Sequence, residues 1–419
     1  MPDSFGPETI EQLTEVIAWA AAEELPLEVI GGGSKRALGR PVQASHGLDL
    51  SRFTGITLYE AEELVLSAGA ATPLAEIQAA LAERKQQLAF EPLDLGPLLG
   101  APAGTGTIGG VLSCNLSGPR RIKAGAARDH FLGLTAVSGR GEVFKSGGRV
   151  VKNVTGYDLG KLLAGSYGTL AAMTAVTVKV LPAPEKTRTV LLLGLDDAAA
   201  CQAMTRALTS MHEVSGAAHL PAAAAAGSAV SYVAEAGGGV TALRVEGPGP
   251  SVEHRCAALR RELADLGQSE ELHSRNTALL WQELTMLRPL AERPELAVWR
   301  LSLPPQAGHR AVREITDGSQ ALYYYDWGGG LVWLGLPAQG AAAESGGESA
   351  GESAGEARVR AAVAPHGGHA SLVRAPEALR AAVAVFQPLE PAKAALTLRI
   401  KDAFDPRHVL NPGRMYAGV

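Results

Sequence analysis

Three glycine-rich segments in the first 170 residues constrain the fold of this chain more than any other feature. They are Gly31-Gly32-Gly33, the run from Gly104 to Gly110, and Gly165-Ser166-Tyr167-Gly168-Thr169 near the end of the stretch from Val151 to Leu170. Glycine lets the backbone turn sharply and brings N–H groups close to a ligand. Three such loops in one half of a chain predict a long ligand that is held along much of its length.

Size and charge exclude several classes of function. The 419 residues are enough for two or three domains with sizeable cores. The net charge is −5, aromatic residues make up 5%, and no basic stripe is interleaved with them, which argues against nucleic-acid binding. The three cysteines (Cys114, Cys201 and Cys256) form no disulfide framework and have no spacing typical of a zinc or iron–sulfur site.

The cysteine usage and the N-terminus indicate a cytoplasmic protein. Met1 to Glu8 carries acids and no basic region, so we expect no secretory signal. The apolar runs are short and interrupted, so we expect no direct membrane insertion. Peripheral attachment at the inner membrane would then depend on partner subunits.

Apolar periodicity and turn residues predict the elements of the first part of the chain. Pro182 and Pro184 close the last of them, and we place a domain boundary after residue 182. The expected elements are a helix over 10–21, strands over 27–30, 48–53 and 63–68, a helix from Thr72 as N-cap to Arg84, a loop over 90–104, a hairpin of 133–138 with 142–145, a helix over 157–164 and a strand over 171–180.

The region from 186 to about 380 has a different pattern. Strands over 187–195 and 240–246 and helices over 198–211 and 251–266 indicate a β-α-β-β-α-β order, which suits an antiparallel sheet with helices on one side. Residues 338–357 repeat Glu, Ser, Ala and Gly, a composition that predicts a disordered loop between two strands.

One motif is misleading. Gly104 to Gly109 matches G-x-G-x-x-G, but a dinucleotide fingerprint needs a strand before it and a helix after it. Prolines precede the match, and Asn115, Gly118 and Pro119 cut any following helix short. Assignment of the chain as a nicotinamide-dependent dehydrogenase would rest on this poor match alone.

The glycine segments match a known family when they are taken together and in order. The Gly31 to Ser34 loop, Thr107 to Gly110 with Asn115, and Lys152-Asn153 to Leu170 follow one another at family-like spacing. The chain resembles the FAD-binding family of vanillyl-alcohol oxidase (PCMH) type, and within it the FAD-binding subunits of bacterial glycolate oxidase (glycolate dehydrogenase) complexes. Phe404 to Met415 is similar to the closing motif of that family.

The resemblance implies an α+β fold in three segments. Residues 1–182 would form a PCMH-type, two-subdomain FAD-binding domain, and residues 183–384 an α+β cap with an antiparallel sheet. Residues 385–419 would return to the FAD domain.

The resemblance also implies non-covalent FAD, because Ser34 and Lys35 stand where some relatives attach flavin to histidine. The residues expected to bind FAD are Ile30, Gly31, Gly32, Gly33, Ser34, Lys35, Thr107, Ile108, Gly109, Gly110, Ser113, Asn115, Gly156, Gly165, Ser166, Gly168, Thr169, Leu170 and Asn411.

The catalytic residues are less clear from the sequence. His366 and His369 make an incomplete metal site, so no metal is expected. His369 lies in a Gly-Gly-His-Ala stretch similar to one in the family, and is either a catalytic residue or an ordinary loop histidine. Arg374 would bind a substrate carboxylate or form a surface salt bridge.

The implied function is the oxidation of a small 2-hydroxy acid, glycolate or D-lactate, to the 2-oxo acid. Flavin performs the redox chemistry, and the chain has no cysteine cluster for its own iron–sulfur centre. The expected partners are therefore a sister FAD subunit and an iron–sulfur subunit. Two alternatives stay open, a flavin-binding electron relay and a non-catalytic assembly subunit, with substrate oxidised on the sister flavoprotein.

Overall fold

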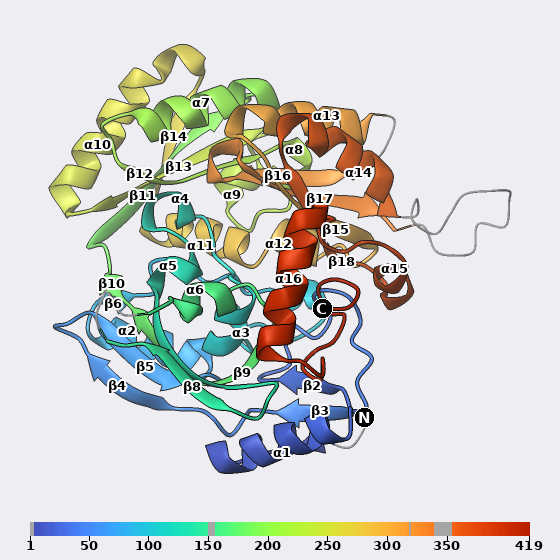
Figure 1. The fold of residues 1–419 in the computed structure, drawn as a ribbon. Coiled ribbons are helices and arrows are strands. Elements are labelled where there is room, and N and C mark those ends of the chain that lie inside the picture. The colour runs from blue at the N-terminus through green and yellow to red at the C-terminus, as the bar shows by residue number, and fades with distance from the viewer. Residues whose placement is uncertain (1–3, 150–155, 318–319, 339–353) are drawn as a thin grey trace, which may run out of the picture. The chain divides into compact units, whose positions relative to one another are not determined.

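The computed structural model describes residues 4–149, 156–317, 320–338 and 354–419 and divides into two compact units. Unit 1 comprises residues 1–117, 125–183 and 388–419, and unit 2 comprises residues 118–124 and 184–387. Both units combine helices with sheets, which confirms the predicted α+β class (Figure 1). The sequence did not indicate that residues 118–124 belong with the second unit.

Unit 1 contains two main sheets of different kinds. Three parallel strands pair in the order β1-β3-β2, and five antiparallel strands pair in the order β4-β5-β9-β7-β8. The short β6 and β10 form a separate antiparallel pair. The strands are β1 (Ser4–Phe5), β2 (Leu27–Ile30), β3 (His46–Asp49), β4 (Ile56–Glu60), β5 (Val65–Gly69), β6 (Gln86–Gln87), β7 (Phe131–Ser138), β8 (Val143–Gly147), β9 (Ala171–Lys179) and β10 (Leu181–Pro182).

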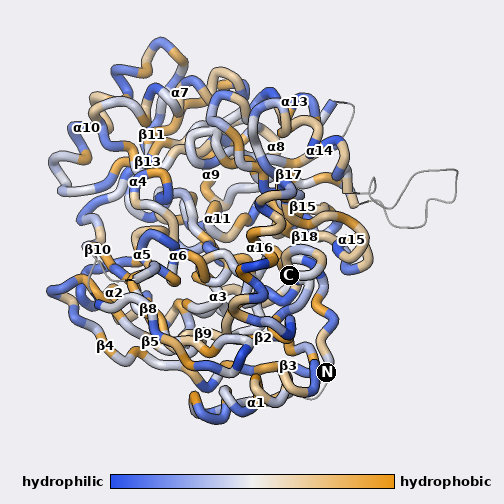
Figure 2. Tube along the Cα trace, in the orientation of Figure 1, coloured by the Kyte–Doolittle hydropathy of each residue, from blue (hydrophilic) through white to orange (hydrophobic). Residues whose placement is uncertain are grey.

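The three predicted helices of unit 1, which correspond to α1, α2 and α6, begin and end close to the predicted positions. Leu13, Ile17 and Ala20 of α1 recur at helical spacing and are buried, and α1 alternates between hydrophobic and hydrophilic residues in Figure 2. The helices are α1 (Ile10–Ala22), α2 (Leu74–Glu83), α3 (Ile108–Ser113), α5 (Ala127–His130), α6 (Leu159–Leu163) and α16 (Pro391–Phe404).

Two local predictions need correction. Pro73, and not Thr72, is the N-cap of α2, because the Thr72 hydroxyl donates to the Gly69 carbonyl at 2.7 Å. The predicted strand over 48–53 ends at Asp49, and the structure adds β4, which the sequence analysis missed. The helix at the G-x-G-x-x-G match, α3, has only six residues. The sequence predicted that any helix there would be short, which argues against a dinucleotide-binding fingerprint.

The C-terminal residues complete the core of unit 1. Val409 and Leu410 pack with Leu13, Leu27 and Leu48. The Leu27 N–H donates to the Val409 carbonyl at 2.7 Å, and the Asn411 N–H donates to the Leu27 carbonyl at 3.0 Å. The last residues of the chain therefore act as an additional neighbour of β2.

Unit 2 is built from two successive β-α-β-β-α-β repeats. The sequence predicted the first repeat only. The first consists of β11 (Lys186–Leu193), α7 (Asp197–Thr209), β12 (Val214–Leu220), β13 (Val240–Gly247), α10 (Gly249–Glu262) and β14 (Ser269–His273). The second consists of β15 (Leu296–Ser302), α13 (Gly308–Thr316), β16 (Leu322–Asp326), β17 (Leu331–Pro337), α14 (Glu356–Val363) and β18 (His369–Arg374).

The two repeats share one antiparallel sheet of eight strands. Its order is β14-β11-β13-β12-β16-β17-β15-β18, so the second repeat mirrors the first. The repeats join where β12 meets β16, at the pair of His219 and Tyr325. Corresponding strands and the corresponding helices α7 and α13 therefore meet at the centre of the unit.

Helices cover both faces of this sheet, which corrects the prediction of helices on one side (Figure 1). Val190 and Leu192 of β11 pack in the core with α7, α10, α13 and α14. Thr189, on the opposite face of the same strand, accepts a hydrogen bond from the indole N–H of Trp281 at 2.8 Å. Trp281 belongs to α11 (Ser274–Thr285), and the other helices of unit 2 are α8 (Ala222–Ala225), α9 (Ser231–Ala234), α12 (Arg288–Ala291) and α15 (Glu377–Ala382).

Polar contacts fix residues 118–124, with α4 (Arg121–Ala124), to unit 2. Arg120 makes a bidentate ion pair with Glu246, with one N···O distance of 2.6 Å and both side chains largely buried. Burial alone would raise the pKa of Glu246, but Arg244 and Arg120 outweigh it and hold the pKa at about 2. Most of the predicted low-complexity loop lies outside the described residues, and α14 begins within its end at Glu356.

Candidate functional site: a glycine-lined groove in unit 1

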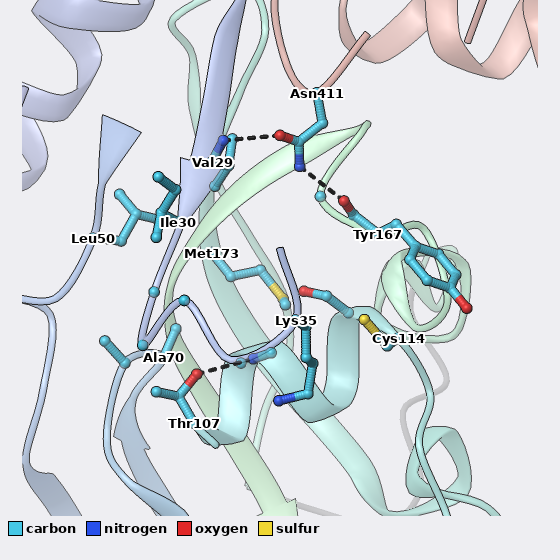
Figure 3. Close-up of a pocket in the computed structure, with 18 of the residues that line it drawn as sticks. Val29, Ile30, Lys35, Leu50, Ala70, Thr107, Cys114, Tyr167, Met173 and Asn411 are labelled. Atoms are coloured by element: carbon cyan, nitrogen blue, oxygen red, sulfur yellow. Dashed lines mark hydrogen bonds between the residues drawn. The ribbon is translucent and has the colours of Figure 1, made fainter. Parts of the chain in front are cut away.

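A groove in unit 1 is lined by all three glycine-rich segments. It encloses about 740 Å³ when the space at its open side is included. Its walls come from the end of β2, the loop after β5, α3, the loop before β9 and the C-terminal segment (Figure 3). Segments that are far apart in the sequence therefore converge on one site.

The first two glycine segments touch each other. A Cβ atom at Gly32 would lie 2.6 Å from the carbonyl oxygen of Thr105, so only glycine fits there without a shift of the backbone. Thr107 is the N-cap of α3 and its hydroxyl accepts from the Gly110 N–H at 3.3 Å. Bare backbone therefore forms this wall of the groove.

Lys35 places a positive charge in the groove. Its Nζ donates to the Ser34 hydroxyl at 3.2 Å and lies beside Gly110, where an added Cβ would be 3.4 Å from Nζ. Burial lowers the pKa of Lys35, while Cys114 and Asp94 act in the opposite direction. An ammonium group has three donors, and the bond to Ser34 uses one of them.

Asn411 connects the first and third segments. Its side-chain oxygen accepts from the Val29 N–H at 2.8 Å, and its amide donates to the Tyr167 carbonyl at 2.9 Å (Figure 3). Gly168 has φ +72°, and a Cβ there would lie 2.8 Å from Asn411 Nδ2. The Tyr167 N–H donates to the Ser113 carbonyl at 2.9 Å, which extends the connection to α3.

A buried ion pair holds the C-terminal segment in place. Lys401 Nζ donates to Asp405 at 2.7 Å, to the Thr169 carbonyl at 2.7 Å and to the Leu410 carbonyl at 2.9 Å. Both side chains are fully buried. Asp405 in turn accepts from the Val409 and Leu410 N–H groups at 3.0 and 2.8 Å. The pair therefore fixes the third loop and the approach to Asn411 together.

Arg414 and Cys114 complete the lining. Arg414 is 7% exposed and donates to the Lys35 carbonyl at 2.7 Å. Burial raises the pKa of the Cys114 thiol, although Lys35 and Arg414 act to lower it. The thiol is therefore protonated at neutral pH.

The structure brings twelve of the nineteen predicted cofactor residues into this lining: Ile30, Gly31, Gly32, Gly33, Ser34, Lys35, Thr107, Gly109, Gly110, Ser113, Gly168 and Asn411. The other seven do not line it. Ile108, Ser166, Thr169 and Leu170 are buried behind it. Asn115 accepts from the Arg128 N–H at 3.0 Å, Gly165 donates to the Leu112 carbonyl at 3.3 Å, and Gly156 is exposed. Lys152 and Asn153 lie outside the described residues.

Sequence reasoning missed ten lining residues: Val29, Arg36, Leu50, Ala70, Ala71, Cys114, Tyr167, Ala171, Met173 and Arg414. Arg36, Tyr167 and Arg414 stand in or beside recognised motifs, so their positions in the sequence could have predicted that they line the groove. Leu50, Ala70 and Met173 are ordinary apolar residues, and only the fold brings them to the groove.

His369 and Arg374 belong to unit 2 and stand at opposite ends of β18. Five residues of strand separate their Cα atoms by roughly 16 Å, too far for both to hold one small substrate without long side-chain reach. Arg374 donates to the backbone carbonyls of Leu290 and Leu296 at 3.1 Å each. These bonds tie its guanidinium to the backbone of unit 2.

The described residues contain neither a metal-binding cluster nor a membrane-spanning helix. No three His, Cys, Asp or Glu side chains in them are grouped to hold a metal ion. No helix in that part of the chain combines the length and the apolar character needed to cross a membrane.

The lining suits an elongated diphosphate. Gly32 leaves no room for a side chain where a phosphate would meet backbone N–H groups, and Lys35 supplies a partly buried cation with unused donors. The apolar side chains of Leu50 and Met173 suit a flat ring.

Comparison with known proteins agrees with this geometry. Residues 5–147 match the family model of an FAD binding domain. The chain is 33% identical over 408 residues to glycolate oxidase subunit GlcE of Escherichia coli (strain K12), covering 97% of each chain. It is 32% identical over 178 residues to a D-lactate dehydrogenase of Archaeoglobus fulgidus, covering 42% of this chain and 38% of the other.

A solved structure with the same fold is 4-ethylphenol oxidase from Gulosibacter chungangensis, with a TM-score of 0.71 at 15% identity, covering 99% of this chain and 89% of the other. The FAD-binding fold inferred from the sequence is confirmed. The near full-length match to GlcE decides the family, and this chain belongs to the glycolate oxidase subunit family of FAD-linked oxidoreductases.

Proposed function

We propose that this chain is the FAD-binding subunit of a complex that oxidises a small 2-hydroxy acid, glycolate in the first instance, to the 2-oxo acid. The observation that carries the proposal is the convergence of the three glycine segments, Lys35 and Asn411 on one groove. The similarity to GlcE over 97% of both chains supports glycolate as the first substrate to test.

The residues of unit 1 bind and orient the cofactor. Backbone at Gly31 to Gly33 and the Lys35 ammonium would hold the diphosphate, and Asn411 holds β2 against the loop that carries Gly168. When bound, FAD supplies the acceptor for two electrons from the substrate carbon. Ser34 and Lys35 offer no imidazole for attachment, so the cofactor is held non-covalently.

His369 is the proposed acceptor of the proton from the substrate hydroxyl. Imidazole titrates near neutral pH and is a frequent general base. His369 is exposed on β18, so a substrate can approach it from solvent. Arg374 donates to backbone carbonyls of unit 2, and its predicted role in binding the substrate carboxylate stays a prediction.

Electrons then leave through partners. The described residues hold no group of side chains that would bind a metal cluster, and the whole chain has only three cysteines. We propose a sister FAD subunit and an iron–sulfur subunit as partners. The cytoplasmic location, with membrane attachment through these partners, stays a prediction.

Flavin release and anaerobic reduction test the proposal. The purified full chain should be yellow and release FAD on denaturation, and glycolate or D-lactate without oxygen should bleach the flavin absorbance. His369→Ala should slow the bleaching by about 100-fold or more while the FAD content stays unchanged. His366→Ala is the matched control and should bleach at the normal rate.

The alternatives give different results in the same experiment. Bleaching that occurs only after the sister subunit is added identifies an electron relay. A colourless chain that cannot be reconstituted with FAD identifies an assembly subunit and overturns the proposal.

A further inference from the structure

A second cavity lies in unit 2, where its two repeats meet. It encloses about 870 Å³ with its open side included and is lined from the start of α7, the end of β12, α13 and the start of β16. The helices α7 and α13 are corresponding elements of the two repeats, as are β12 and β16. The cavity is therefore a product of the repeat junction and is separate from the residues that line the FAD groove.

One wall of this cavity is acidic. Asp197 accepts hydrogen bonds from the hydroxyls of Tyr323 and Tyr325 at 3.0 and 2.8 Å. Burial acts to raise the pKa of Asp197, but His219 and the two tyrosines outweigh it and hold the pKa below its usual value. Asp196, the N-cap of α7, adds a second carboxylate to the lining.

His219 is an incompletely bonded group in the same wall. It is fully buried, and its Nδ1 lies 2.9 Å from the Thr241 hydroxyl. Its Nε2 lies 3.4 Å from Asp197 Oδ1, but the geometry is not that of a hydrogen bond, so this nitrogen has no hydrogen-bond partner among the described residues. Buried polar atoms without a hydrogen bond are uncommon, and such an atom is able to bond to a bound molecule.

The opposite charge comes from α13. Arg313 is exposed and lines the cavity, and no ion pair to it is found among the residues that the structure describes. His309 lies one turn earlier, and its buried Nδ1 also has no hydrogen-bond partner within the described chain. Burial, Arg310 and Arg313 lower the pKa of His309, whereas Asp197 and Asp196 act to raise it. The carboxylates and the guanidinium groups therefore act on His309 in opposite directions. Because its pKa is lowered overall, His309 is neutral at pH 7.

We propose that this cavity binds a small zwitterionic amino acid, with its ammonium group at Asp197 and its carboxylate at Arg313. Asp197 is an ionised carboxylate whose side chain is 25% exposed, and such a group favours a cation. Arg313, for which the described residues offer no ion pair, favours a carboxylate. A molecule with only one charge leaves the other wall without its counter-charge. The proposal is independent of the FAD groove and of the substrate of oxidation.

Calorimetric titration of the full, FAD-loaded chain tests this site. Glycine, β-alanine and 4-aminobutyrate separate the two charges by increasing lengths, and acetate and methylamine carry one charge each. At least one zwitterion should bind about ten-fold more tightly, or better, than either single-charge compound.

Three variants assign the binding to this cavity. Arg313→Gln and Asp197→Asn should each weaken the zwitterion by about ten-fold or more. Arg310→Gln is the matched control, because Arg310 is an exposed arginine of the same helix that does not line the cavity, and its affinity should stay normal. Arg313 is on the surface, so its variant keeps the test decisive even if Asp197→Asn disturbs the tyrosine bonds.

Several results would overturn the site. These are no heat of binding from any zwitterion at millimolar concentration, acetate or methylamine binding as tightly as the zwitterion, and equal losses in Arg313→Gln and Arg310→Gln. Variants of Lys35 that lose FAD should keep the zwitterion, so failure of the FAD proposal and failure of this one are distinguishable.

Discussion

The groove of unit 1 and the cavity of unit 2 differ in what lines them: glycine backbone contributes to the groove, and charged side chains line the cavity. In the groove, N–H groups and side-chain-free backbone at Gly32, Gly110 and Gly168 form much of the surface. In the cavity, the chemistry comes from the side chains of Asp197, His219 and Arg313. A backbone surface needs glycine at fixed places in the sequence, whereas a side-chain surface needs only the fold to bring charges together.

This difference explains why one site is recognisable in the sequence and the other is not. The groove requires local glycine runs, which are recognisable in the amino-acid sequence. The cavity residues lie on α7, β12 and α13 and form no local motif. Their meeting depends on the antiparallel pairing of β12 with β16, which no local pattern predicts.

The largest expected effect comes from the ion pair behind the groove. Lys401→Met leaves the Asp405 carboxylate buried without its cation and removes the bonds to the Thr169 and Leu410 carbonyls. We expect the free energy of unfolding to fall by about 3–5 kcal/mol, measured by chemical denaturation of the flavin-free chain. FAD affinity should fall with it, because the backbone wall loses its support.

The control for this prediction lies on the same helix. Lys393→Met replaces an exposed lysine of α16 and should change stability by less than about 0.5 kcal/mol. The double variant Lys401→Met with Asp405→Asn should lose less than Lys401→Met alone, because no unpaired charge stays buried. A double variant as unstable as the single one contradicts this account of the pair.

A methyl group tests the backbone surface directly. Gly32→Ala places Cβ 2.6 Å from the Thr105 carbonyl oxygen, so one glycine segment must move away from the other. We expect FAD affinity to fall by about 2–3 kcal/mol, or about 30- to 150-fold, measured by fluorescence titration of the flavin-free chain. Gly148→Ala, where an added Cβ meets nothing within 4 Å, should bind FAD normally. Normal binding by Gly32→Ala would mean that the two segments do not need their close contact.

Most of unit 1 was predictable because its signals are local. The strand over 27–30 and the hairpin around Gly139 to Gly141 were placed closely, since apolar runs and turn residues stand side by side there. For unit 2, the sequence predicted only the α+β class with an antiparallel sheet and the first of its two repeats. The mirrored second repeat was missed, because the low-complexity segment interrupts it between β17 and α14.

The same division holds within the groove. Gly31 to Lys35, Thr107 and Asn411 stood in motifs and were named, whereas Leu50, Ala70 and Met173 were not. Thr169 and Leu170 were expected at the ligand from the family resemblance, yet both are buried and neither lines the groove. A motif indicates which segment reaches a ligand, but the direction of each side chain depends on its packing.

Lys35 adds a charged side chain to a groove that is also lined by bare glycine backbone, and its removal should have the smallest effect of the three changes. Lys35→Met removes the cation that lies beside Gly110, and we expect FAD affinity to fall by about 1.5–2 kcal/mol, or about ten- to thirty-fold. Lys145→Met, an exposed lysine outside the lining, is the control and should bind normally.

The pH dependence separates charge from shape at this position. Because burial lowers the pKa of Lys35, the ammonium group loses its proton at a lower pH than an ordinary lysine. A diphosphate binds the protonated form, so FAD affinity in the natural chain should fall as the pH rises through this lowered pKa. Lys35→Arg keeps its charge and should bind FAD with a flat profile over the same range. If Lys35→Met shows the same alkaline decline as the natural chain, a group other than Lys35 titrates, and the proposed role of the Lys35 charge is wrong.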